Sequence, residues 1–568
     1  MGQEVRATSE DDLIAIPPPG EAEVIDLPAD DSRAAYVRNT AVMSLGTALS
    51  RLTGFLRLAA QTAALGVTVS ALGNTYATAN TTPNIVYELV LGGILTSVFV
   101  PVFVAWKQRH GRDQAWAVAE RVLTIALVVL LLVAVIGAVL APQIMRLYLS
   151  ASDAPDKASQ VALGSYFLRW FMPQIVFYGI GAVATGLLNS ERRFAVPMFA
   201  PILNNLVVIA TFGVYAWSLH GASPSVADIT GTQRLVLAAG TTLGVVAMTV
   251  VLWPSLRRLG FRWHLRFDWN HAAVRRLGRL ASWVVVYVLA NQIAYVIIIV
   301  LNGRFEAGYQ IYATAFILFS LPHAIFVVSI FTALLPGMSD RWAAADPAGV
   351  RTLFSRGIRD TVVIIVPASL GYVALALPIV RLLLEHGQAL PTDAEQIART
   401  LQAFALGLPF FSTFQLLTRT FYALQDTRTP ALVNAAAAAV NIGADLVLIN
   451  AFGLGVPGLA LGHAVSYAFA TVACALLLRR RLSSIDGRRV AQTAARVLPA
   501  ALASGGAAAL AAWGVRELAG DPGALGVQLV EVAAGVVAGV LAFVGCALMF
   551  GIREVDEVKS AVLRRFRG

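Results

Sequence analysis

The chain has 568 residues, of which 57% are hydrophobic and 13% charged, and its net charge at pH 7 is +10. Soluble domains carry about a quarter charged residues, so the composition excludes an ordinary soluble protein and predicts an all-α polytopic membrane protein. The two cysteines lie in apolar stretches and fit neither a disulfide framework nor a metal site.

Residues 1–36 differ in composition from the rest of the chain. They include Glu10-Asp11-Asp12 and Pro17-Pro18-Pro19, with few large apolar side chains. Such a segment cannot bury a core, so we expect a disordered acidic tail.

Fourteen hydrophobic segments follow, and most reach the ~20 residues that a membrane-spanning helix needs. Lys and Arg are concentrated in alternate loops, and the loop after the sixth segment alone holds Arg257, Arg258, Arg262, Arg266, Arg275, Arg276 and Arg279. By the positive-inside rule, this asymmetry predicts a multi-pass protein with both termini cytoplasmic. The segments lie near 38–66, 72–106, 114–141, 160–189, 195–219, 232–256, 274–302, 307–338, 358–384, 394–424, 430–452, 456–479, 491–515 and 525–551.

Short patterns recur between the two halves of the chain. Pro83 followed by ILTSVFVP (94–101) resembles Pro322 followed by IFTALLP (330–336). A repeat of six spans keeps its orientation, which is the parallel-repeat arrangement of some transporters. We expect a first lobe at 37–266, a second at 267–487, and a last helix pair with a short basic cytoplasmic tail at 488–568.

The first segment carries two arginines, Arg51 and Arg57, well inside its apolar stretch. A charge at the centre of a spanning helix costs about 2.5–3.5 kcal/mol on insertion scales, so a functional role facing a cavity is expected. On a helix the arginines share a polar stripe about 140° wide. Its members are Thr40, Ser44, Thr47, Ser50, Arg51, Gly54, Arg57 and Gln61.

The second segment is unusually polar from Asn74 through Pro83 and Asn84 to Tyr87 and Glu88. Two interpretations remain open, a cavity lining and hydrogen-bonded helix packing. In the cavity interpretation, Glu88 could pair with one of the arginines of the first segment.

Asn441 and Asp445 of the eleventh segment are four residues apart and therefore share a helix face. They could bind a small cation or a proton, or form a structural hydrogen bond, and Asn291 of the seventh segment could complete the site. The sequence shows no catalytic constellation, so we expect neither an enzyme nor a resident metal or cofactor.

Several runs resemble the MurJ (MviN) lipid II flippase family of the multidrug/oligosaccharidyl-lipid/polysaccharide exporter superfamily. They are SRLTGFLR (50–57), the Pro83-Asn84 pair, TSVFVP (96–101), LLNSERRFAVPMFAPILNN (187–205) and FYALQDTRTP (421–430). The resemblance implies fourteen helices in two six-helix lobes plus a final pair. It also implies alternating access in peptidoglycan synthesis at the bacterial cell membrane.

By position, the resemblance assigns Arg51 and Arg57 to the anionic lipid-linked substrate, a polyprenyl diphosphate bearing a disaccharide-pentapeptide. It assigns Asn441 and Asp445 to a sodium site known in some members. A double arginine that other members carry after the Pro-Asn pair is replaced here by Tyr87 and Glu88, beside Asn84.

The coupling energy could come from Na+, H+ or the membrane potential. Membrane lipids and cell-wall or division proteins are the expected partners, and nucleic acid is not. Two other functions stay open at this point, another exporter of the superfamily and a non-transporting cell-wall or division scaffold.

Overall fold

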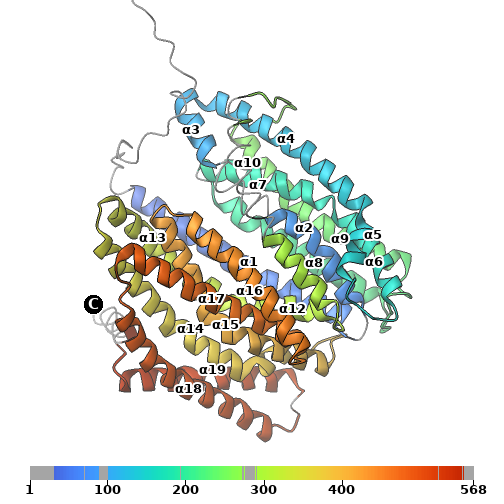
Figure 1. Cartoon of the computed structure of the whole chain (residues 1–568). Helices are drawn as coiled ribbons and strands as arrows, with labels where there is room; N and C mark the ends of the chain where they lie inside the picture. The colour runs from blue at the N-terminus through green and yellow to red at the C-terminus, as the bar shows by residue number, and fades with distance from the viewer. Residues whose placement is uncertain are drawn as a thin grey trace, which may run out of the picture.

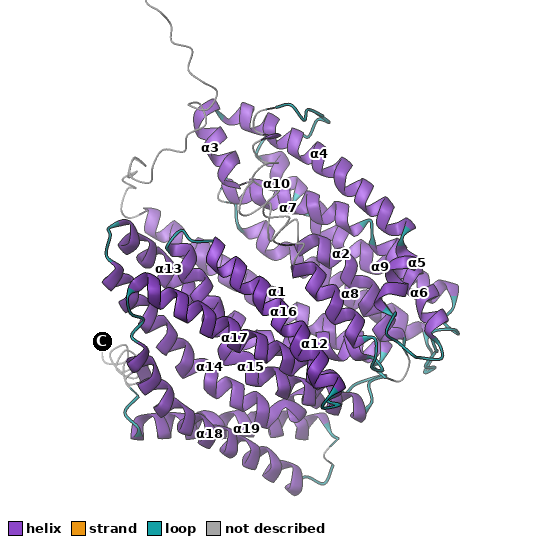
Figure 2. Cartoon of the chain, viewed as in Figure 1, coloured by secondary structure: helices purple, strands orange, loops and turns teal. Residues whose placement is uncertain are grey.

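A computed structural model describes residues 31–68, 71–88, 100–191, 193–271, 274–275, 288, 291–521, 523–552 and 554–555. Every regular element in these residues is helical (Figure 2). The helices of the first half are α1 (Asp31–Leu65), α2 (Leu72–Glu88), α3 (Val100–His110), α4 (Arg112–Val139), α5 (Ala141–Tyr148), α6 (Lys157–Phe171), α7 (Gln174–Ser190), α8 (Ala195–Ser218), α9 (Gly231–Val250) and α10 (Trp253–Arg258).

The second half begins with the helix Asn291–Asn302 and ends with two long helices that pack against each other. A π-helical turn, η2 (His323–Val327), follows Pro322. The remaining helices are α12 (Gly308–Pro322), α13 (Val328–Ala343), α14 (Pro347–Leu384), α15 (Pro391–Ala423), α16 (Arg428–Asn450), α17 (Gly455–Leu482), α18 (Gly487–Leu518) and α19 (Leu525–Met549).

Eleven helical stretches in the described residues are long and apolar enough to cross a membrane. They correspond to the predicted segments three to six and eight to fourteen. The prediction of a polytopic helical protein is therefore confirmed. The other three segments contain α1, α2 and the helix Asn291–Asn302, and residues 89–99 and most of 272–290 lie outside the described part.

Helix α1 begins at Asp31, whereas the sequence analysis placed residues 31–36 in the tail. Asp31 and Ser32 are residue types favoured at helix starts, and the alanines that follow favour helix. The remainder of the predicted tail, residues 1–30, lies outside the described residues.

The helices form two groups, α2–α10 and α12–α19, and α1 runs beside both (Figure 1). The core of the first group is centred on the buried ring of Tyr76, which packs edge-on against Phe167, Phe171 and Phe212 at centroid distances of 5.8, 5.5 and 5.5 Å. Its hydroxyl shares a 2.7 Å hydrogen bond with Thr241. Helices α2, α6, α8 and α9 are thereby fixed around one residue.

Helix α15 is the centre of the second group and contacts α12, α13, α14 and α17. The last two helices pack against each other and against α14 at the edge of the molecule (Figure 1). Small residues allow the close approach of α18 and α19, since a Cβ atom at Gly539 would lie 3.2 Å from Ala508 Cβ. Ser504 also donates a 2.8 Å hydrogen bond to the Gly539 carbonyl.

Hydrogen bonds join the end of α1 to the second group. Thr68 donates to the buried carboxylate of Asp393 through its hydroxyl and, at 3.2 Å, through its backbone N–H. The Gln388 N–H donates to the Ala63 carbonyl at 2.9 Å. We call these bonds the α1–α15 clasp.

A second connection lies beside the α1–α15 clasp. The buried side chain of Gln310, at the start of α12, donates to the Gly66 carbonyl at 2.9 Å, and its backbone N–H donates to Asn74 Oδ1 at 3.1 Å. This end of the molecule is therefore held closed by hydrogen bonds from both groups.

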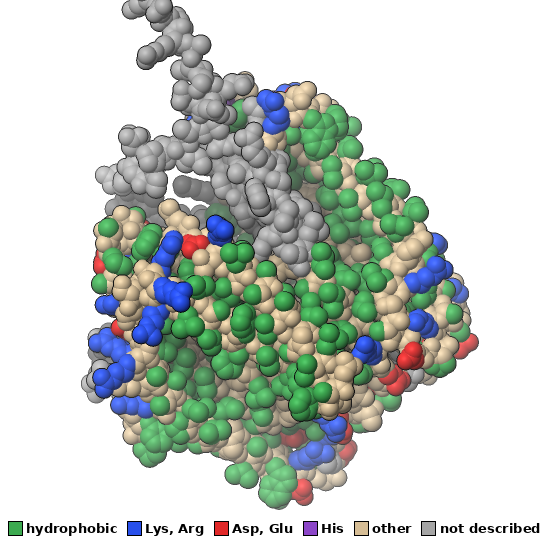
Figure 3. Space-filling view, viewed as in Figure 1, with side chains coloured by type: hydrophobic (Ala, Val, Ile, Leu, Met, Phe, Trp, Pro, Cys, Tyr) green, Lys and Arg blue, Asp and Glu red, His purple; other side chains and the backbone are tan. Residues whose placement is uncertain are grey.

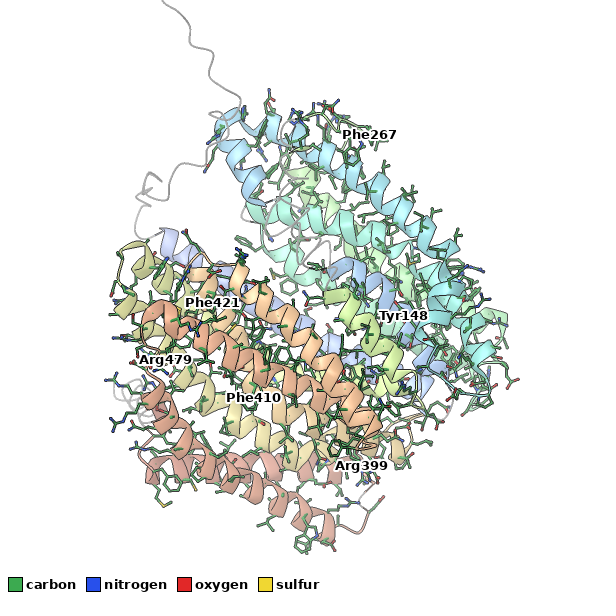
Figure 4. All side chains as sticks on the ribbon, in the orientation of Figure 1. Tyr148, Phe267, Arg399, Phe410, Phe421 and Arg479 are labelled. Atoms are coloured by element: carbon green, nitrogen blue, oxygen red, sulfur yellow. The ribbon has the colours of Figure 1, made fainter. Side chains whose placement is uncertain are left out.

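Exposed charged side chains gather at the two ends of the visible face, with a broad apolar surface between them (Figure 3). Arg399 on α15 and Arg479 on α17 lie at opposite ends of the second group (Figure 4). This distribution suits a protein surrounded by lipid.

Candidate functional site

Helix α1 presents both predicted arginines. Arg51 is exposed and Arg57 is partly buried, and their positions differ by about 9 Å along the helix axis. Within the described residues neither guanidinium forms a hydrogen bond or an ion pair with the protein. Two cationic groups are therefore available to an anionic ligand.

Helix packing fixes the orientation of α1. Asn205 of α8 donates to Thr53 Oγ1 at 3.0 Å and to the Ser50 carbonyl at 3.3 Å. A Cβ atom at Gly46 would lie 2.9 Å from Met198 Cβ, so the helices approach closely there. Ser50 of the predicted polar stripe thus lies at a helix contact.

Asn84 and Tyr87 of α2 both contact Tyr178 of α7, a residue that is not predicted from the sequence. Tyr178 of α7 donates a long hydrogen bond of 3.4 Å to Asn84 Oδ1. Its ring lies 4.4 Å from that of Tyr87, centroid to centroid. Arg57 is near enough to Tyr178 and Tyr76 to act on both electrostatically.

The structure therefore brings Arg57, Asn84 and Tyr87 into one neighbourhood around Tyr178, formed by α1, α2 and α7. Arg51 lies on the same helix as Arg57 but on a more exposed face. Glu88 is the last residue of α2, and its side chain lies outside the described part, as does its suggested pairing with an arginine.

The second predicted constellation lies on α16. Asn441 donates a 3.0 Å hydrogen bond to Asp445 Oδ1, and Asp445 is fully buried. Its other oxygen, Oδ2, has no hydrogen-bond partner among the described residues. Gly462 of α17 makes room for the carboxylate, because a Cβ atom there would lie 1.9 Å from Asp445 Oδ1.

In the described part of the chain, Asn291 does not bond to Asn441 or Asp445. Its Oδ1 accepts a hydrogen bond from Asn434 Nδ2 at 2.5 Å. Asn291 and Asn441 nevertheless line one cavity of about 320 Å³ between the helix Asn291–Asn302, α12, α16 and α17. Of these polar cavity residues, Asn291 and Asn441 are predicted from the sequence and Asn434 is not.

Oxygen atoms such as those of Asp445 and Asn441 are the ligands preferred by hard cations. The unpartnered, buried Oδ2 is the feature that fits such an ion, because a buried carboxylate oxygen without a partner is costly. The pair can therefore hold a small cation or a proton.

Comparisons with solved structures show which fold this is. A MurJ lipid II flippase in an inward closed conformation has a TM-score of 0.71 at 17% identity, over 90% of this chain and 99% of that one. An inward-facing multidrug resistance MATE family transporter of the MOP superfamily has a TM-score of 0.62 at 15% identity, over 78% and 99%. The chain therefore shares its fold with these two transporters.

Proteins related in sequence identify the family to which the chain belongs. A probable lipid II flippase MurJ of Rhizobium meliloti (strain 1021) is 28% identical over 414 residues, which is 73% of this chain and 75% of the relative. The lipid II flippase MurJ of Burkholderia cenocepacia (strain J2315) is 26% identical over 393 residues, or 68% and 72%. The family model "Lipid II flippase MurJ" matches residues 62–527, so the chain belongs to the lipid II flippase MurJ family.

Proposed function

We propose that this protein is a lipid II flippase that moves the lipid-linked peptidoglycan precursor from the inner to the outer leaflet by alternating access. Family membership and the polytopic helical fold support the transport activity. The observation that carries the mechanism is the pair of arginines on α1 without protein partners in the described residues. Flipping breaks no covalent bond, so the protein acts as a transporter and not as an enzyme.

The diphosphate of the substrate is the ligand for Arg51 and Arg57. A guanidinium binds phosphate oxygens through charge-assisted, often bidentate hydrogen bonds. Asn84 and Tyr87 lie in the neighbourhood of Arg57 and would contact the same head group, and Glu88 follows them on α2. Because the resemblance implies that Tyr87 and Glu88 replace two arginines, Arg51 and Arg57 would supply most of the positive charge that binds the diphosphate here.

Fourteen spans make up the transporter. Eleven of them are the candidate spans, and the other three are α1, the second segment and the seventh segment. Helix α1 is 35 residues long, so its length suffices, and the polar stripe with its arginines accounts for its low hydropathy. An even number of spans places both termini on the same side of the membrane, and the Lys and Arg content of the loops assigns that side to the cytoplasm. Residues 37–266 and 267–487 act as two lobes, and residues 488–568 supply the last helix pair.

Alternating access requires that one end of the site is closed while the other is open. In this topology the turn after α1 lies on the outer side, so the α1–α15 clasp and the bonds of Gln310 close the outer end. In this proposal, a state with its outer end closed in this way would receive substrate from the cytoplasmic leaflet. Opening to the outside would break these bonds.

Asp445 and Asn441 form the coupling site in this proposal. Binding of Na+ or H+ to the buried carboxylate would remove an uncompensated charge and favour one packing of α16 against α17. Asn291 contributes to the cavity beside the site and not to the hydrogen bond itself.

The arginine role is tested by rescue of a bacterium depleted of its own flippase. Arg57→Gln and Arg51→Gln each remove one charge and keep a polar side chain. We expect each variant to be expressed and to fail in rescue, with the double variant fully inactive.

Arg399→Gln is the matched control, since Arg399 is an exposed arginine whose guanidinium pairs with Glu395 at 3.7 Å on the same helix, α15. This control should rescue growth as wild type does. Full rescue by the double α1 variant would refute the diphosphate role of these arginines.

A further inference from the structure

The cavity in the second group of helices is polar but uncharged. Among the described residues that line its 320 Å³ there is no Asp, Glu, Lys or Arg. Its polar side chains are three asparagines, one serine and one histidine, namely Asn291, Asn434, Asn441, Ser466 and His463. Amides and hydroxyls both donate and accept hydrogen bonds, so this lining suits a ligand rich in hydroxyl or amide groups.

Aromatic rings complete the wall. Four tyrosines line the cavity, Tyr295, Tyr309, Tyr312 and Tyr467. Small-molecule sites are mostly apolar or aromatic with a few placed polar groups, in cavities of about 300–1,000 Å³. The volume lies at the low end of that range, so the cavity accommodates a single ring and not a complete head group.

His463 has an unused hydrogen-bonding atom at this wall. Its Nε2 is buried without a partner among the described residues. The imidazole is flanked by rings on several sides, with Tyr467 at 4.6 Å and Phe316 and Phe404 each at 5.5 Å between centroids. Because the Nε2 atom has almost no accessible surface in this state, it reaches a ligand hydroxyl or amide only when the ring turns toward the cavity.

The cavity adjoins the part of α2 that carries the proposed diphosphate neighbourhood. Tyr309 of the cavity wall shares a hydrogen bond with Thr81, one turn before Asn84. Tyr295 of the wall in turn shares a 2.9 Å hydrogen bond with Tyr309. Ile85 and Val86 of α2 pack against the same hydrophobic cluster as Tyr295.

We propose that this cavity binds an uncharged sugar ring of the transported head group, while the α1 arginines hold the diphosphate. The inference rests on the proposed function. It assigns the uncharged sugar and the charged diphosphate of the head group to different sites. Charged parts of the peptide are excluded, because burying an unpaired charge among neutral groups is costly. The ring hydroxyls and amide would bond the asparagines and His463, and its C–H faces would lie against the tyrosines.

The test compares two ligands that differ by the sugar. Purified protein in lipid nanodiscs is titrated with lipid II and with undecaprenyl diphosphate, which keeps the lipid-linked diphosphate, with one more ionisable oxygen, and has no sugar. His463→Phe keeps an aromatic ring and removes the nitrogen. We expect about a tenfold loss of affinity for lipid II, the size of one buried hydrogen bond, and no change for undecaprenyl diphosphate.

His323→Phe is the matched control, because His323 is also buried, bonds Ser412 at 3.1 Å and lies outside the cavity lining. It should leave both affinities unchanged. Asn434→Ala is a second cavity variant for the case that His463→Phe does not fold, and it should show the same selective loss. Free N-acetylglucosamine, added as competitor, should weaken lipid II binding only at high concentration.

The outcomes separate the two proposals. Equal losses for both ligands, no loss for either, or a loss that appears only when Na+ is present would each overturn the sugar assignment. Arg57→Gln should weaken both ligands alike. If wild-type protein binds neither ligand, the proposed function itself fails.

Discussion

Arg51 and Arg57 are costly residues in a membrane helix, and their surroundings show how the cost is limited. Helix α1 is packed against α8 on one side through Gly46 and Ser50, and Leu58 belongs to the core of the second group. The face of α1 next to Arg57 is therefore covered by protein. A partly buried guanidinium with no neutralising partner among the described residues is an arrangement that a bound anion stabilises.

Tyr178 illustrates what residue-level sequence reasoning could not find. It occurs in an apolar stretch of small residues and shares no motif with Asn84 or Tyr87. Its contacts depend on how α7 packs against α2, which is a tertiary property. By contrast, Asn441 and Asp445 were found because a spacing of four residues alone places two side chains on one face.

Gly462→Ala should disturb the Asp445 site by size alone. The added Cβ atom would lie 1.9 Å from Asp445 Oδ1, so the carboxylate or helix α17 has to move. We expect a destabilisation of about 1–3 kcal/mol, visible as a lower melting temperature of the purified protein.

Gly443→Ala is the control for this substitution. Gly443 is on the same helix as Asp445, and no atom lies within 4 Å of a Cβ atom built there. Alanine favours helix over glycine by about 0.5–1 kcal/mol, so this variant should be unchanged or slightly more stable. Equal destabilisation by both substitutions would contradict the packing argument.

At the scale of elements, the apolar helices were predictable from the sequence, because a long hydrophobic segment in lipid has few alternatives to a spanning helix. Eleven of the predicted segments correspond to candidate spans. The start of α1 was less predictable, since its first turns at Asp31 and Ser32 are polar and resemble the acidic tail before them. Hydropathy detects the apolar part of a helix and not its polar extension.

The α1–α15 clasp was not foreseen, because its partners are far apart in sequence. Asp393 is a buried carboxylate near the start of α15 that accepts from the Leu390 N–H at 2.9 Å and from Thr68. One side chain thus both caps its own helix and holds the end of α1. Loss of this carboxylate should weaken the contacts at this end, which the proposed topology places on the outer side.

Asp393→Ala should therefore shift the protein toward a state that is open to the outside. Each lost hydrogen bond to a buried charged group is worth about 1.5–3 kcal/mol. A single cysteine at Ala71, which lines a pocket beside the clasp, should react faster with a membrane-impermeant thiol reagent in this background.

Asp153→Asn is the control, because Asp153 lines the same pocket, is exposed and takes no part in the clasp. It should leave the labelling rate unchanged. An unchanged rate in Asp393→Ala would show that the clasp does not determine the closed end.

At the scale of the whole molecule, the chain combines two helix groups joined at one end, with the cationic and neutral sites in different places. The arginines lie on α1, which runs beside both groups, whereas the Asp445 pair and the uncharged cavity lie in the second group. A substrate head that contacts both groups would couple its binding to their relative movement. This arrangement is what alternating access requires.

The central claim is tested most directly by locating lipid II in the two leaflets of cells depleted of this protein. The account predicts that lipid II accumulates in the inner leaflet on depletion. Expression of wild-type protein should restore the outer-leaflet pool, whereas Arg57→Gln should not. A normal outer-leaflet pool in depleted cells that contain no other flippase would contradict the account.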